Sequence, residues 1–139
     1  MKTVLVMAAI VVGLFGCASG PAQKNRVAMD ERLVGTWQGE REAGGKCAFL
    51  AWKMVRAADG QFSIDFFSDK NRSQTWAKEQ GRWWTDNGRL VLKTDGVQKA
   101  DIYAYQFVSS SSVRFVNLKR DPSADCQADY EFTDHKVGN

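Results

Sequence analysis

Apolar and polar residues alternate along most of this chain, from Leu33 to Thr133, and short turn sequences interrupt the alternation. Asp59-Gly60 and Asn87-Gly88 lie between apolar runs, and such dipeptides are strong hairpin signals. No stretch of this region has the period of an amphipathic helix, whereas a period of two is typical of strands with one buried face. The predicted strands cover residues 33–42, 47–56, 61–68, 73–85, 89–94, 101–108, 113–118 and 126–133.

Eight short strands joined by tight turns predict an all-β fold, an eight-stranded antiparallel up-and-down barrel in a single domain over residues 31–135. A barrel of this size is either filled by side chains or holds one small ligand. A two-sheet sandwich is the alternative, but it usually needs longer crossover connections than the predicted loops provide. In a closed meander the first strand lies between the second and the eighth.

The N-terminus carries a different signal. Lys2 is followed by a run of uncharged, mostly apolar residues over 4–15, which is short for a membrane-spanning helix. Such a run is typical of a secretory signal. Residues 18–30 are small, polar and charged without periodicity, so a linker is expected there. Thirteen flexible residues reach about 20 Å, enough to clear lipid headgroups.

Leu14, Gly16 and Cys17 resemble the lipobox of bacterial lipoproteins, although a residue smaller than Phe15 is usual in that box. The resemblance implies a signal peptide over 1–16, cleavage after Gly16, and acylation of Cys17, which would begin a lipidated N-terminus and linker over 17–30. Ala18 then implies sorting to the outer membrane, with the domain facing the periplasm. The alternative is an ordinary secretory signal with a buried or free Cys17.

The other two cysteines, Cys47 and Cys126, open the predicted second and eighth strands, which begin at the same rim of the barrel. Across one intervening strand they would be about 9 to 10 Å apart, and a disulfide needs Cα atoms within about 7 Å. We expect the flanking loops to bend inward and a disulfide to form, as is usual in an oxidising compartment. Two free buried thiols are the alternative.

Gly35-Thr36-Trp37, at the start of the first predicted strand, resembles the Gly-x-Trp signature of lipocalins and lipocalin-like domains. In that family the tryptophan plugs the closed end of an eight-stranded barrel, and the cavity holds a small apolar or amphipathic molecule. The present chain is shorter than full lipocalins, and no counterpart of their late arginine on the tryptophan is identified.

Aromatic residues are frequent on the alternating faces and are the candidates for a ligand site. The predicted ligand-binding residues are Trp37, Trp52, Phe62, Phe66, Trp84, Tyr103, Tyr105 and Phe115. The alternative is that these rings only fill a small barrel. Trp83 and Trp84 must face opposite sides of their strand, so one of them is expected to point outward.

Catalysis is not indicated, and we expect no enzyme, no cofactor and no metal. The single histidine, His135, falls in a predicted frayed tail, and no His/Cys cluster has zinc spacing. Asp65 and Glu79 could pair as carboxylates, but solvated outer-face positions are the favoured interpretation. The 19 basic and 16 acidic residues are interspersed, which argues against nucleic acid as a partner.

Two functions remain open from the sequence. The first is a membrane-anchored envelope lipoprotein whose barrel binds a small apolar or amphipathic ligand. The second is a filled barrel that binds another envelope protein, as an inhibitor or assembly accessory. A cavity of about 300 Å³ or more, lined by aromatic residues and open at one end, would favour the first.

Overall fold

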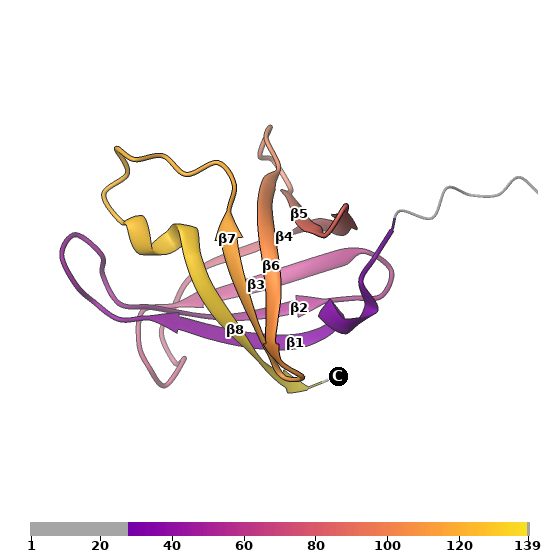
Figure 1. Ribbon diagram of the computed structural model, residues 1–139. Coiled ribbons are helices and arrows are strands. Elements are labelled where there is room, and N and C mark those ends of the chain that lie inside the picture. The colour runs from indigo at the N-terminus through magenta and orange to yellow at the C-terminus, as the bar shows by residue number, and fades with distance from the viewer. Residues whose placement is uncertain (1–27, 139) are drawn as a thin grey trace, which may run out of the picture.

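The structure is a computed structural model that describes residues 28–138 (Figure 1). The predicted signal peptide at 1–16, the acylation site Cys17 and most of the predicted linker lie outside the described residues. Within the described part, no helix is long and apolar enough to cross a membrane.

The described residues form a closed barrel of eight antiparallel strands in simple sequence order, with β1 between β2 and β8. This confirms the predicted up-and-down barrel and excludes the sandwich. The strands are β1 (Gly35–Arg41), β2 (Leu50–Arg56), β3 (Gln61–Phe67), β4 (Thr75–Asp86), β5 (Arg89–Thr94), β6 (Asp101–Ser109), β7 (Ser112–Asn117) and β8 (Glu131–Gly138).

The last strand lies further along the chain than predicted. Residues expected to begin it form a 3-10 turn, η2 (Gln127–Tyr130), and β8 continues through the segment expected to be a frayed tail. His135 pairs with Gln38 of β1 and with Ser112 of β7. Closure of the barrel requires a strand that bonds to both neighbours, so this polar segment is ordered by pairing on its two edges.

The N-terminal segment closes one end of the barrel. The turn η1 (Glu31–Leu33) precedes β1, and Leu33 and Trp37 are fully buried there. The indole N–H of Trp37 donates to the Leu33 carbonyl at 2.9 Å. Burial of Trp37 at this end agrees with the position that the Gly-x-Trp resemblance implied. Figure 1 shows η1 at one end of the barrel and η2 at the other.

Of the two adjacent tryptophans in β4, Trp83 faces the barrel interior and Trp84 faces outward. Trp83 is 2% exposed, and its indole N–H donates to the Ala57 carbonyl at 2.9 Å. Gly81 shares its face, because a Cβ there would meet the Lys93 carbonyl and the Phe62 ring. Trp84 therefore lies on the opposite, outer face of the strand, where it pairs with Val91.

The predicted disulfide is confirmed. Cys47 and Cys126 are bonded with a Cα–Cα distance of 4.9 Å. Neither lies in a barrel strand: Cys47 is in the β1–β2 loop, and Cys126 immediately precedes η2. Because both loops leave the sheet, the cysteines come closer than strand spacing alone allows. The bridge ties η2 to the end of the barrel opposite η1.

Candidate functional site

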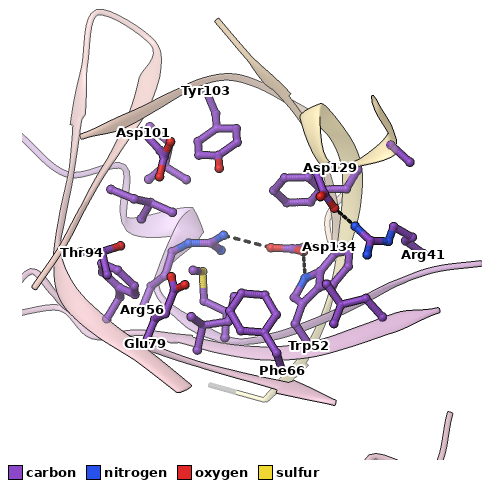
Figure 2. A pocket seen from close by; sticks show the side chains of 18 of the residues that line it. Arg41, Trp52, Arg56, Phe66, Glu79, Thr94, Asp101, Tyr103, Asp129 and Asp134 are labelled. Carbon is purple, nitrogen blue, oxygen red and sulfur yellow. Dashed lines mark hydrogen bonds and ion pairs between the residues drawn. The ribbon is translucent and has the colours of Figure 1, made fainter. Parts of the chain in front are cut away.

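A cavity of about 270 Å³ lies inside the barrel, toward the end that carries η2. Its lining residues come from every strand except β7, together with η2 (Figure 2). The mouth is formed by residues at the ends of their strands, such as Arg41 and Thr94, and by Ala128 of η2. The volume is slightly below the value of about 300 Å³ expected for a ligand pocket.

Aromatic rings make up much of the wall. Trp52 and Phe132 meet edge to face at 5.4 Å, and Tyr103 meets Phe132 at 5.6 Å. At the mouth, Phe66 contacts Trp76 at 6.3 Å, and Trp76 is 69% exposed. These edge-to-face contacts hold the rings in fixed orientations, so the apolar wall is largely pre-formed.

A buried ion pair forms part of the cavity wall. Arg56 of β2 donates from Nη2 to Asp134 Oδ2 of β8 at 2.9 Å, and Trp52 donates to Asp134 Oδ1 at 2.8 Å. The guanidinium also lies 5.0 Å from the centre of the Phe115 ring. Burial lowers the pKa of Arg56, and the charge of Asp134 acts in the opposite direction.

The hydrogen bonding of Arg56 is incomplete within the described residues. Its Nε and Nη1 atoms are buried and have no hydrogen-bond partner there. Figure 2 shows the side chain reaching across the cavity toward Asp134. Buried donors without an acceptor cost about 1–3 kcal/mol each, so the cavity wall contains unmet hydrogen-bonding capacity.

Charges at the mouth are distributed unevenly. Arg41 forms an ion pair with Asp129 of η2 on one side. Glu79 and Asp101 lie on the other side (Figure 2), and neither forms an ion pair with another described residue. Partial burial raises the pKa of both carboxyls, and the charge of Asp101 raises the pKa of Glu79 further.

Four of the eight predicted ligand-binding residues line this cavity: Trp52, Phe62, Phe66 and Tyr103. They come from three strands, and the alternation on each strand predicted their inward direction. Burial raises the pKa of the Tyr103 hydroxyl well above its ordinary value, so it stays protonated at neutral pH.

The other four lie elsewhere. Trp37 and Phe115 are fully buried beside Arg56 and do not line the cavity. Tyr105 donates its hydroxyl to Asp30 at 2.9 Å, on the η1 side of the barrel. Trp84 is on the outer face of β4, because Trp83 occupies the inward position.

The six charged residues that line the cavity were not among the predicted ligand-binding residues: Arg41, Arg56, Glu79, Asp101, Asp129 and Asp134. Arg56 continues the inward face of Leu50, Trp52 and Met54, so the alternation contained a signal for it. Glu79 lines the cavity, whereas the sequence favoured an outer-face position. Asp65, its suggested carboxylate partner, instead pairs with Lys78 at 3.2 Å.

No metal site is found among residues 28–138, where no three His, Cys, Asp or Glu side chains converge suitably. His135 Nδ1 lies 2.9 Å from the Ser112 hydroxyl on the exposed side of β7 and β8. Both side chains are exposed or half-buried, and the neighbouring carboxylate, Asp134, points into the barrel toward Arg56.

The sequence matches no protein-family model, and a search of curated proteins finds no significant relative. The class of the protein therefore follows from its own architecture. It is a closed eight-stranded antiparallel barrel with an internal cavity whose wall combines aromatic and aliphatic side chains and whose mouth carries carboxylates.

Proposed function

We propose that this protein is an envelope lipoprotein whose lipocalin-like barrel binds a small apolar or amphipathic molecule. The observation that carries the proposal is the cavity: a barrel filled by its own side chains would leave no such space. Its volume of about 270 Å³ lies just below the usual range of ligand pockets, so the ligand is small.

The alternative, a filled barrel that acts as a protein-interaction or inhibitor module, has less support. Its premise was a solid interior, and the interior here is hollow toward one end. The exposed Trp76 could contribute to a partner surface, but it also lines the cavity and contacts Phe66. Its position is therefore accounted for by a ligand mouth.

The described chain enters the barrel at the end opposite the cavity mouth. Ala28, the first described residue, is at the closed end, where its carbonyl accepts a hydrogen bond from the Thr85 N–H at 2.9 Å. The chain from Cys17 to Ala28 spans at most about 40 Å. The proposed linker would therefore join the barrel at its closed end.

Calorimetric titration with 1-naphthol, a small amphipathic probe, tests the ligand site. We expect saturable binding to the wild type and its loss in Leu92→Trp, which fills the cavity from β5. Binding that persists in this variant would place the probe outside the cavity. Native mass spectrometry of protein purified from its own host then identifies any molecule that co-purifies.

Membrane fractionation of cells that express the full-length protein tests the anchor. We expect the wild type in the membrane fraction and Cys17→Ser in the soluble fraction. Cys47→Ser with Cys126→Ser provides the matched control, because it removes two cysteines without touching the lipobox. Unchanged membrane association of Cys17→Ser would refute acylation at this residue.

A further inference from the structure

Both cationic side chains that line the cavity are already engaged. Arg41 forms an ion pair with Asp129, and Arg56 forms one with Asp134. Each of these positive charges is thus already balanced by a carboxylate, and a ligand carboxylate would bring a second negative charge beside Asp129 or Asp134. The cavity is therefore poorly suited to a fatty acid or another organic anion.

Two carboxylates of the lining remain without an ion pair among the described residues. Glu79 of β4 and Asp101 of β6 lie on the same side of the mouth, with Thr94 of β5 between their strands (Figure 2). Lys119 is close enough to favour the charged form of Asp101, but it does not line the cavity. The mouth thus presents excess negative charge to an entering molecule.

The adjoining wall suits a cation as well as an apolar body. Trp52, Phe66, Trp76, Tyr103 and Phe132 expose ring surface to the cavity. Aromatic faces attract ammonium groups, which is the basis of aromatic cages for amines. A flexible apolar ligand gains from the same rings by burial of its carbon atoms.

An independent observation comes from the buried interior. Arg56, which lines the cavity and is 1% exposed, has two donor nitrogens, Nε and Nη1, without an acceptor among the described residues. A ligand that carries an oxygen at its inner end would supply an acceptor there. The site therefore favours a molecule with opposite polar characters at its two ends.

We propose that the ligand is a small amphipathic amine, with its ammonium group at Glu79 and Asp101 and its apolar body between the aromatic rings. This rests on the proposed ligand-binding function and names the chemical class of the ligand. The cationic end stays at the mouth, near water, while an oxygen-bearing end points toward Arg56.

Three probes of one shape test this assignment by calorimetry at pH 7. Tyramine, 4-ethylphenol and 3-(4-hydroxyphenyl)propanoate share the phenol and differ in charge, being cationic, neutral and anionic. We expect tyramine to bind about tenfold more tightly than 4-ethylphenol, as estimated from one ion-pair and one cation–π contribution. The anion should bind more weakly than the neutral probe.

The double variant Glu79→Gln with Asp101→Asn tests the residues. It should abolish the preference for tyramine and leave binding of 4-ethylphenol unchanged. The matched control, Glu31→Gln with Asp86→Asn, removes two acidic charges at the closed end and should retain the preference. Thermal melting of each variant checks that the barrel is folded.

The outcomes separate this inference from the proposed function. Binding of all three probes with equal affinity, or a preference for the anion, would overturn the amine assignment and leave ligand binding intact. A tyramine preference that survives in the Glu79/Asp101 variant would also overturn it. If the wild type binds neither 1-naphthol nor any of the three phenols, both the proposed ligand-binding function and the amine assignment would be overturned.

Discussion

Arg56 and Asp134 are 78 residues apart in the sequence and meet inside the barrel, where Nη2 donates to Oδ2 at 2.9 Å. Each side chain is 1% exposed. A buried ion pair is costly to break, because removal of one partner leaves the other charged, desolvated and uncompensated. The pair also joins β2 to β8 across the interior, so it bears on the integrity of the whole barrel.

We expect Asp134→Asn to lower the free energy of unfolding by about 3–5 kcal/mol. The double variant Arg56→Met with Asp134→Leu should lose much less, since it removes both charges and replaces them with apolar volume. Urea denaturation measures both values. Glu42→Gln, which breaks the exposed pair with Lys70, provides the control and should change stability by less than about 1 kcal/mol.

The same ion pair shows where sequence reasoning succeeded and where it could not. Alternation placed Trp52, Phe62 and Phe66 on inward faces correctly, since an apolar side chain at every second position has one favourable direction. A buried charged residue is an exception to this pattern, because its polarity predicts an exposed position. Asp134 lies in a polar run that is typical of a chain terminus, and this run is ordered because β8 pairs with both β1 and β7.

Strand β4 illustrates a second limit of the sequence. Trp83 and Trp84 are adjacent and similar in size, so periodicity alone could not decide which one faces inward. Gly81 lies on the same face as the buried Trp83, and its position against the Lys93 carbonyl leaves no room for a side chain. That constraint depends on the neighbouring strand and cannot be read from β4 alone. Glu79 shares this inward face, which explains why its place at the mouth was missed.

The disulfide between Cys47 and Cys126 should contribute to stability and to the shape of the mouth. The bond links residues 79 apart in the sequence. Cys126 immediately precedes η2, which supplies Ala128 and Asp129 to the cavity wall. In the chain-entropy model, a loop of this length corresponds to about 4 kcal/mol. We expect Cys47→Ala with Cys126→Ala to unfold at correspondingly lower urea concentration.

Mass spectrometry with alkylation checks the bridge itself. Only after reduction should Cys47 and Cys126 become labelled in the folded, oxidised protein. Labelling of either cysteine without reduction would contradict the pairing. Hydrogen exchange of the double alanine variant should increase in η2 while β2 and β3 remain protected, because the bridge anchors the loops rather than the strands.

The Asp30 carboxylate accepts four hydrogen bonds at the closed end of the barrel. Three come from the Arg32 backbone and side chain, and one comes from the Tyr105 hydroxyl at 2.9 Å. The Arg32 guanidinium lowers the pKa of Asp30, and burial with the bond to Asp30 raises the pKa of Tyr105 to about 12. The stability from Asp30 is therefore present above its unfolded pKa and is lost as the pH falls through its folded pKa.

We expect Asp30→Asn to cost about 1–2 kcal/mol at pH 7, from loss of the cap and weakening of the charged hydrogen bonds. The difference from the wild type should be smaller at acidic pH than at pH 7, because the stability from Asp30 is lost as the pH falls through its lowered folded pKa. Urea titrations at both pH values measure it. A difference of equal size at the two pH values would show that the charge of Asp30 is not involved.

Glu79 should show the opposite dependence on pH. Partial burial and the charge of Asp101 raise its pKa, so the folded state holds its proton more tightly than the unfolded state. Stability from this group falls as the pH rises from the unfolded pKa through the folded pKa. We expect Glu79→Gln to raise the melting temperature slightly at pH 7, with no gain near about pH 3.5, where both forms are neutral.

Gly39 leaves the space that the Trp52 indole occupies. A Cβ at this position would lie 2.3 Å from the ring, and the indole cannot simply move, because it donates to Asp134 and contacts Phe132. Overpacking of this kind costs about 1–3 kcal/mol. We expect Gly39→Ala to destabilise the barrel by that amount in urea denaturation.

The control for this prediction is Gly44→Ala in the β1–β2 loop, where a Cβ meets nothing within 4 Å. Its stability should change by less than about 0.5 kcal/mol. The indole of Trp52 also lines the cavity, so Gly39→Ala should weaken 1-naphthol binding, whereas Gly44→Ala should not. Full stability with unchanged binding in Gly39→Ala would mean that Trp52 is free to shift, contrary to the fixed wall on which the ligand site depends.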